Sequence, residues 1–394
     1  IVFGDWSSDV CSSDLWYSAG SRDQRGWYAE LKIPFFNMRF RDLEEHLWGF
    51  AMLRTISKTA SRSNWVPHLP EWEMNTRMSR LGHLAGLSGI RSGRHLEVRP
   101  YGLAGSSKAG TAAPDQRLSA GLDLRFNPAN NFTADLAVNP DFAQVDADVA
   151  DINLTRFPTR FSELRPFFTE RTNIFNTPME LFYSRRIGSR GDILGGLKIT
   201  GKTTNGFEYG LLSCRTGHSM LANTGNDAAM AEKATFTVAR LKKDLFNSSS
   251  LGILAAGKEM QNSYDRVMGI DGTLVMPGNF FLDYQAARRL TREDQPFSSA
   301  CKLLLTRTGD LLGFDMEFNR TEAQFDINGI GYVKKEPDRG WQFGRLNTRF
   351  GPRIYGKHIR RIYWNSQARI GHELYTREYL NTWLQQNPAL LPAA

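Results

Sequence analysis

The chain has 394 residues, a formal net charge of +8 and 41% hydrophobic residues, enough for one large domain or two ordinary ones. Its basic residues are interleaved with acidic ones and it has no zinc-finger or RNP-like motif, which argues against nucleic-acid binding. The three cysteines form no CxxC pair, which argues against a disulfide framework or a zinc site. No apolar window is long enough for a membrane-spanning helix, whereas spanning strands hide half their residues from lipid and stay open as an interpretation.

Residues 1–15, IVFGDWSSDVCSSDL, differ in character from the rest of the chain and resemble translated sequencing-adapter read-through. We interpret them as a non-native segment. Residues 16–93 begin with two predicted strands, GWYAELKIPF (26–35) and LWGFAMLRTI (47–56), in which apolar and polar residues alternate. The glycine-punctuated run that ends at Gly93 predicts a domain boundary there.

From residue 94 onward, the alternation becomes persistent. RLSAGLDLRF (117–126) obeys it at all ten positions, and NFTADLAVN (131–139) repeats it after a short turn. Membrane-spanning strands need about 9–11 such residues, whereas strands of soluble proteins average about 5–6. The pattern therefore predicts an antiparallel meander that closes into a β-barrel. Further strands are predicted at 181–187, 193–203, 206–213, 234–243, 250–259, 265–276, 278–289, 313–320, 340–350 and 361–370, and the tail 378–386 is the one candidate for a longer helix.

Residues 139–176 interrupt the alternation. The segment is dense in Asp, Arg and Phe at irregular spacing, and it fits neither a helical period nor a long strand. A solvated loop rarely carries so many phenylalanines, so we expect the segment to pack against the strands, inside the barrel.

Four motifs of this region carry a family resemblance: NPDFAQVDADVADINLTRF (139–157), RPFFTERTNIF (165–175), LFYSRRIG (181–188) and ILGGLKITGKT (193–203). They resemble the bacterial domain-of-unknown-function family numbered 5916. The resemblance implies an outer-membrane β-barrel over 94–394, and it implies that 16–93 is the end of a periplasmic β-sandwich similar to carbohydrate-binding family 9. The family motif FPEKRPFF reads FSELRPFF here, so Ser162 and Leu164 depart from it. The resemblance implies no reaction.

The aspartates of the central segment are candidates for a cation site. Asp141, Asp146, Asp148 and Asp151 could supply oxygens to calcium, but the spacing is not that of an EF-hand loop. The alternative is that they cap turns or pair with nearby arginines. We therefore expect no metal and no cofactor, and keep calcium as the alternative.

A glycoside hydrolase would need two carboxylates on opposite sides of a sugar. Asp146, Asp148, Glu163 and Glu170 have the right chemistry, but sequence gives no separation between them. There is no GxSxG elbow, P-loop, HExxH or dinucleotide fingerprint. We therefore favour a protein without catalytic activity over an enzyme.

Three arginines and two tryptophans complete the candidate residues. We expect Arg165 and Arg185 to pair with Glu163, Glu170 or the aspartates and so hold the central segment to the inner wall; Arg186 lies beside them. Trp65 and Trp72 lie in irregular chain and are candidates for stacking on sugar rings.

Together these patterns predict an all-β chain: an outer-membrane-type antiparallel β-barrel, complete or partial, preceded by a β-sandwich fragment. The leading interpretation is transport or surface handling of glycan-related or other small substrates in the bacterial outer membrane, with the N-terminal part periplasmic. The alternatives are a membrane-associated hydrolase acting on carbohydrate and a non-catalytic carbohydrate-binding protein. The expected partners are membrane lipid and a carbohydrate ligand, not nucleic acid.

Overall fold

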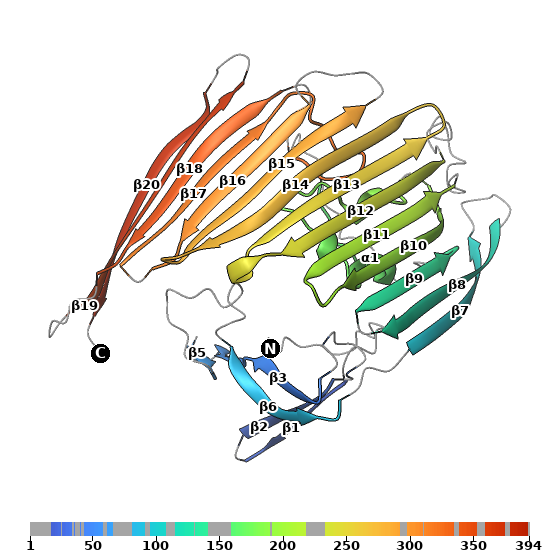
Figure 1. Ribbon diagram of the computed structural model, residues 1–394, viewed down its shortest axis with the longest axis horizontal. Coiled ribbons are helices and arrows are strands. Elements are labelled where there is room, and N and C mark those ends of the chain that lie inside the picture. Colours follow the sequence, from blue (N-terminus) through green and yellow to red (C-terminus); the bar gives the residue numbers. More distant parts are fainter. Residues whose placement is uncertain are drawn as a thin grey trace. The chain divides into compact units, whose positions relative to one another are not determined.

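A computed structural model shows an all-β chain made of antiparallel strands, as the alternation predicts (Figure 1). It describes residues 17–24, 26–33, 35, 40, 43–57, 61–65, 81–90, 95–107, 115–129, 131–140, 159–189, 191–217, 233–291, 298–309, 311–334, 339–352, 359–374 and 379–392. The chain forms two compact units, 1–95 with 129–131, and 96–128 with 132–394.

The first unit consists of three two-stranded antiparallel pairs. β1 (Tyr17–Asp23) pairs with β2 (Gly26–Lys32), β3 (Glu45–Phe50) with β6 (Gly82–Ser88), and β4 (Leu53–Ile56) with β5 (Ser61–Asn64). The predicted strand 47–56 is therefore split between β3 and β4, which have different partners. The similarity of this unit to a carbohydrate-binding sandwich stays a prediction.

The second unit is built on one sheet of 14 strands whose order follows the sequence, with β7 at one end and β20 at the other. Neighbours in the sequence pair because short turns join them, as a meander requires. The strands are β7 (His95–Ser107), β8 (Asp115–Ala129), β9 (Phe132–Val138), β10 (Ile193–Lys202), β11 (Phe207–Thr216), β12 (Ala234–Asp244), β13 (Ser250–Met260), β14 (Tyr264–Met276), β15 (Phe280–Thr291), β16 (Ser299–Arg307), β17 (Leu312–Thr321), β18 (Trp341–Phe350), β19 (Ile359–Glu373) and β20 (Tyr379–Pro392).

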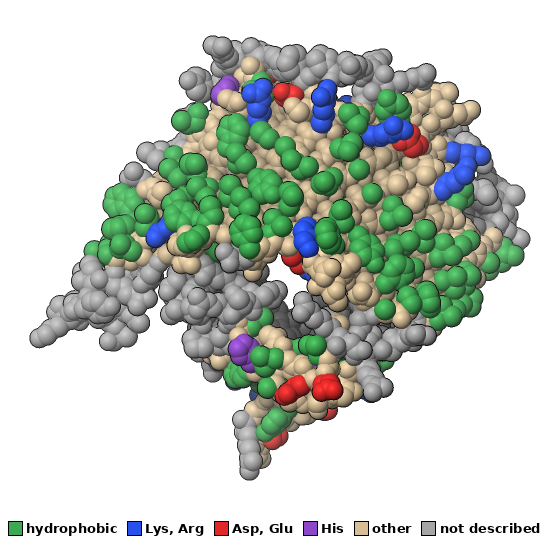
Figure 2. Space-filling model, in the orientation of Figure 1, with side chains coloured by type: hydrophobic (Ala, Val, Ile, Leu, Met, Phe, Trp, Pro, Cys, Tyr) green, Lys and Arg blue, Asp and Glu red, His purple; other side chains and the backbone are tan. Residues whose placement is uncertain are grey.

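The two faces of this sheet differ in chemistry. The inner face, which we define as the face contacted by residues 159–189, carries the polar side chains of β9 to β15, among them Asp135, Lys198 and Arg240. The outer face is the opposite one and carries exposed apolar side chains, which Figure 2 shows spread over the sheet. The two sets alternate along each strand because successive side chains point to opposite faces.

Apolar side chains on the outer face lie opposite one another on neighbouring strands. The registers pair Ile253 with Ile270, Leu303 with Phe318, and Met316 with Leu346. All of these side chains are exposed except for partial contact with their neighbours; Ile270, for example, is 49% exposed. The apolar side of the predicted alternation is therefore the side that no described part of the chain covers.

The segment 159–189 packs on the inner face and forms the core with it. It contains α1 (Pro166–Thr169) and the 3₁₀ turns η4 (Asn173–Phe175) and η5 (Ser184–Arg186), as Figure 1 shows for α1 beside β10 to β12. The predicted strand 181–187 is wrong, because Leu181, Tyr183 and Ile187 are buried in this segment instead of alternating on a sheet. The core joins Phe168, Phe175, Leu181 and Ile187 to inner-face residues such as Leu212, Val238, Leu254 and Val267.

Glycines on the inner face make room for these side chains. A Cβ at Gly196 would lie 3.0 Å from the ring of Phe167, and one at Gly210 would lie 2.9 Å from the ring of Phe175. A Cβ at Gly269 would lie 2.5 Å from Leu181. The segment can approach the sheet closely only because these positions lack side chains.

Residues 322–334 form a second cover on the inner face. Phe325, Ile327 and Ile330 are buried, and Gly331 lies against the backbone of Glu180 and Leu181. The tail, which the sequence offers as a helix, is instead the strand β20, paired with β19 from Ile359 to His372. A neighbouring strand edge satisfies its backbone hydrogen bonds, which outweighs local helix propensity. Within the described residues, no helix is long and apolar enough to cross a membrane.

Candidate functional site

Polar side chains of the inner face hold the backbone of the inner segment. Lys198 in β10 is fully buried, and its Nζ donates hydrogen bonds to the carbonyl oxygens of Phe167 (2.6 Å) and Glu170 (2.8 Å). Asp135 in β9 lies 3.2 Å from the same Nζ and balances its charge. Because a buried ammonium must have partners, Lys198 fixes the position of α1 and the residue after it.

Two further contacts anchor the same turn. Arg125 in β8 pairs with Glu170, and it also pairs with Asp135 at 2.8 Å. Arg171 donates hydrogen bonds to Asn127 (2.9 Å) and to Thr133. Glu170 is therefore engaged by the wall of the sheet.

A buried ion pair supports the next part of the segment. Arg240 in β12 and Asp271 in β14 form two hydrogen bonds of 2.5 and 2.7 Å, and Arg240 Nε donates to the carbonyl oxygen of Ile174 at 3.2 Å. The pair crosses β13 at Gly252, where a Cβ would lie 2.6 Å from the guanidinium. Further along, Gln285 accepts from Met179 N and donates to Met179 O.

Arg165 joins the segment to itself. It forms a bidentate pair with Glu163, with hydrogen bonds of 2.8 and 2.7 Å, and donates to the carbonyl oxygens of Ser184 and Ile187. Ser184 Oγ also donates to Glu163 at 2.7 Å. Burial raises the pKa of Glu163, but the hydrogen bonds and charge of Arg165 and the bond from Ser184 outweigh it and hold that pKa below its usual value. Glu163 is thus an ionised structural carboxylate.

The other two arginines lie in η5. Arg186 donates to the carbonyl oxygen of Gly331 and to Asn328, both at 3.2 Å, so it joins the inner segment to the second cover. Arg185 is half-buried beside it. The expected partners of Arg165 and Arg185 on the wall are therefore not those that the structure describes: Arg165 pairs within the segment, and Glu170 pairs with Arg125.

Several candidate residues lie elsewhere. Asp141, Asp146, Asp148, Asp151 and Trp72 lie outside the described residues. Trp65 belongs to the first unit, is 58% exposed and contacts the ring of Phe50 at 5.4 Å. Over the described ranges, no group of three or more His, Cys, Asp or Glu residues could hold a metal ion.

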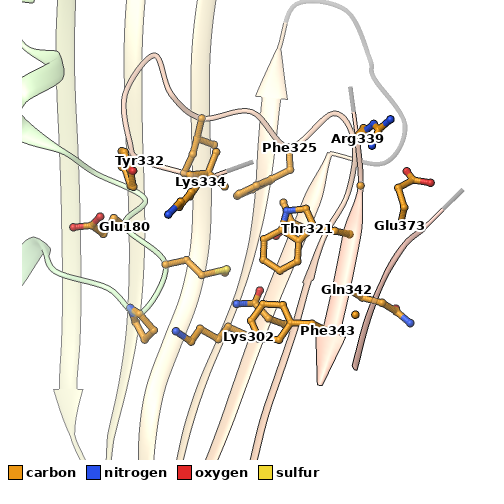
Figure 3. Close-up of a pocket in the computed structure, with 18 of the residues that line it drawn as sticks. Glu180, Lys302, Thr321, Phe325, Tyr332, Lys334, Arg339, Gln342, Phe343 and Glu373 are labelled. Atoms are coloured by element: carbon orange, nitrogen blue, oxygen red, sulfur yellow. The ribbon is translucent and has the colours of Figure 1, made fainter. Parts of the chain in front are cut away.

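A cavity of about 750 Å³ lies on the inner face where β16 to β19 meet the two covers (Figure 3). Residues 178–180 and 325–334 border it on one side, and Glu180, Tyr332 and Lys334 lie together there (Figure 3). The strands supply Lys302, Phe343 and Glu373 on the other sides. The size suits a ligand of one or two rings.

Aromatic side chains form one wall of the cavity. The rings of Trp341 and Phe343, two residues apart in β18, stack with centroids 5.2 Å apart and an angle of 13° between their planes. The Arg369 guanidinium lies 4.5 Å from the centroid of Phe343. Since Phe343 contacts both Trp341 and Arg369, the three groups form a continuous stack, and the indole of Trp341 is its aromatic end.

Charged groups surround this stack. Lys302, Lys334, Arg339 and Arg369 line the cavity together with Glu180 and Glu373. Below Lys302, Glu317 pairs with Lys302 at 3.5 Å and with Arg345 at 2.5 Å. The cavity therefore combines a flat apolar surface with hydrogen-bonding groups and more cations than anions, an arrangement suited to a polar or acidic ring-containing ligand.

Sequence reasoning did not find this cavity. Its lining comes from strands that are far apart in the chain and from the second cover at 322–334, a stretch with no motif. The alternation in 340–350 does place Trp341 and Phe343 on one face, and this was the available signal. Lys198 could have been recognised in the same way, as a lone lysine on the inner face of β10.

No curated protein and no solved structure matches the chain. The family model that does match is described as a domain of unknown function. It covers the strands β7 to β9, the central segment and the first residue of β10, which include Arg165, Glu170 and Arg185. Over residues 94–193, this chain carries the domain of unknown function DUF5916, as the motifs of the central segment indicated.

Proposed function

We propose that the protein is an outer-membrane protein whose 14-stranded sheet crosses the lipid bilayer and whose inner cavity binds a small saccharide-like solute for uptake or surface handling. The single observation that carries the membrane part is the exposed apolar outer face. A soluble sandwich buries the apolar side of its strands and exposes the polar side. Here, the polar side holds the inner segment through Lys198, Arg240 and Gln285, and the apolar side is left uncovered by the described residues.

Strand lengths support this proposal. β10 and β11 have 10 residues each, β12 and β13 have 11, and β14 has 13. A strand tilted by about 45° needs roughly 9–11 residues to cross the hydrocarbon layer. The strands thus have the length that a bilayer requires.

Aromatic side chains at one edge of the outer face add further support. They lie within a few residues of the strand ends that face the short turns 203–206, 277–279 and 308–311. Membrane strands carry such aromatic girdles where the hydrocarbon meets the headgroups. The members of this row are Phe126, Phe207, Phe280, Phe314, Phe350 and Trp364.

The stack of Trp341 and Phe343 supports the saccharide class of the ligand. Aromatic faces bind the apolar faces of sugar rings, and nearby charged groups bind hydroxyl or carboxylate oxygens. Arg369 and Lys302 supply donors at the two ends of this wall. The hydrolase alternative gains no support from the described residues, because Glu163 and Glu170 are each engaged by an arginine.

Folding into lipid tests the membrane part. The purified chain is diluted from urea into phosphatidylcholine vesicles and into buffer alone, and both samples are run unboiled and boiled on a denaturing gel. We expect a boiling-sensitive mobility shift and protease protection with vesicles only. A folded, monomeric, protease-resistant protein in buffer alone would disprove membrane insertion.

Ligand binding is tested separately with the folded chain. Neutral oligosaccharides and their uronic acid counterparts are titrated while tryptophan fluorescence is recorded. We expect saturable binding that is lost in Trp341→Ala and retained in Trp364→Ala, since Trp364 is on the outer face. Binding that is equally weak in all three proteins would disprove a saccharide site in the cavity.

A further inference from the structure

Four arginines form a row along one edge of the outer face. Arg215 in β11, Arg266 in β14, Arg288 in β15 and Arg320 in β17 each lie within three residues of a strand end, and all are exposed. Because the sheet is antiparallel and ordered by sequence, the end of β11, the start of β14 and the ends of β15 and β17 lie at the same edge. Figure 2 shows Lys and Arg side chains gathered along the upper edge of this face.

The row has a net positive charge. Arg266 pairs with Glu259 at 2.6 Å, and Arg320 lies 3.5 Å from Glu322; both contacts involve exposed groups and are weak in water. Among the described residues, neither Arg215 nor Arg288 has an ion-pair partner. Four guanidinium groups and two carboxylates thus share this edge.

The row borders the apolar side chains of the same strands. On the outer face, Arg266 is followed by Met268 and Ile270 in β14, and Arg320 is preceded by Phe318 and Met316 in β17. With those apolar residues in hydrocarbon, the guanidinium groups two residues away would lie at the depth of the headgroups. Arginine at this depth binds phosphate through paired N–H donors.

The connections identify which leaflet this would be. At this edge, the strands are joined by 139–192, 217–233, 292–298 and 322–340, whereas the opposite edge has the short turns 203–206, 245–249, 277–279 and 308–311. Outer-membrane strands have short periplasmic turns and longer extracellular loops. The arginine row would therefore face the outer leaflet, and the aromatic row the inner one.

We propose that the arginine row binds the phosphate groups of a phosphorylated glycolipid in the outer leaflet. The inference rests on the proposed membrane function, and it adds a lipid site that is distinct from the cavity. Charge complementarity identifies the ligand: a line of guanidinium groups at one membrane surface matches lipid phosphates, and no matching row of cations borders the apolar residues at the described short-turn edge of β11 to β17 apart from Lys243 and Arg307.

The test compares the full chain with Arg215→Gln/Arg288→Gln, in which the two arginines without ion-pair partners lose their charge. Lys243→Gln is the matched control, because Lys243 is on the same face at the opposite edge and contacts the Phe207 ring at 4.1 Å. Each protein is folded into phosphatidylcholine vesicles with and without 10% of a diphosphorylated glycolipid or its dephosphorylated form. Lipid retained by the purified protein is then quantified by mass spectrometry.

We expect all three proteins to insert equally into phosphatidylcholine. The unchanged chain and Lys243→Gln should retain the phosphorylated glycolipid, and the double variant should retain it about 30-fold less, since each arginine near an anionic surface contributes about one unit of favourable free energy in kcal/mol. Equal retention by all three, or no preference for the phosphorylated form, would overturn the lipid site alone. Failure of the unchanged chain to insert into any vesicle would overturn the membrane proposal and this one with it.

Discussion

Arg240 and Asp271 face each other across an intervening strand, and both are buried beneath the inner segment. Their contact passes over Gly252, and Arg240 also holds the carbonyl oxygen of Ile174. One ion pair thus links three strands of the sheet to the segment that lies on it. Removal of one partner would leave a buried charge without compensation.

Arg240→Ala should therefore lower the free energy of unfolding by about 3–5 kcal/mol. Lys202→Ala is the matched control, because Lys202 pairs with Asp244 on exposed strand ends and should cost less than about 1 kcal/mol. Urea unfolding followed by tryptophan fluorescence measures both. Similar small costs for the two variants would contradict a structural role of the buried pair.

Arg165→Ala should loosen the inner segment without unfolding the sheet. The side chain donates to Glu163 and to the carbonyl oxygens of Ser184 and Ile187, so its loss leaves three groups without their donor. Limited proteolysis should cut within 159–189 faster than in the unchanged chain. Equal protease resistance would show that the apolar contacts of the segment hold it without this arginine.

Acidification should act on the same contact through Glu163. Its pKa is lowered in the folded chain, so in the pH range between the unfolded value near 4.5 and the lower folded value the unfolded state binds more protons. The stabilisation is present above pH 4.5 and is lost as the pH falls through the folded pKa. Hydrogen exchange of 159–189 between pH 3 and 6 should show this loss.

Glu163→Gln provides the comparison for that measurement. The variant cannot ionise at this position, so the part of the pH dependence due to Glu163 should be absent while exchange at pH 6 is faster than in the unchanged chain. An identical pH profile in both proteins would assign the acid sensitivity to other groups.

Charge on the outer face should cost most at the centre of a strand. Ile270 lies in the middle of β14 and Met276 is its last residue, and both side chains are on the outer face. Ile270→Arg should lower the free energy of folding into phosphatidylcholine vesicles by about 2–4 kcal/mol, and Met276→Arg by about 0–1 kcal/mol. A soluble outer face would give two equally small effects.

Trp341→Ala should weaken saccharide binding in the cavity by roughly threefold to tenfold, the contribution of one aromatic contact. The indole is the accessible end of the stack that Phe343 and Arg369 continue. Isothermal titration of the folded chain measures this loss. Unchanged affinity in Trp341→Ala, together with reduced affinity in a variant of Lys302, would place the ligand against the strand β16 instead.

The sequence by itself determined the all-β class, most strands of the second unit and the irregular segment between them. Two-residue alternation and turn residues are local properties, so RLSAGLDLRF predicts a strand without reference to its partners. The family resemblance over the central segment was also legible in its motifs and is confirmed over 94–193. Local patterns failed at 181–187 and 378–386, where burial against Ile330 and pairing with β19 decided the conformation.

Only the tertiary structure decided which face of the sheet the inner segment covers and which residues hold it there. Alternation shows that a strand has two unlike faces but not which of them the rest of the chain contacts. Lys198 meets the backbone of Phe167 and Glu170, and Trp341 joins Arg369 through Phe343, by contacts between residues far apart in the chain. The cavity and the arginine row arise in the same way, because strand register brings together side chains whose sequence positions carry no common pattern.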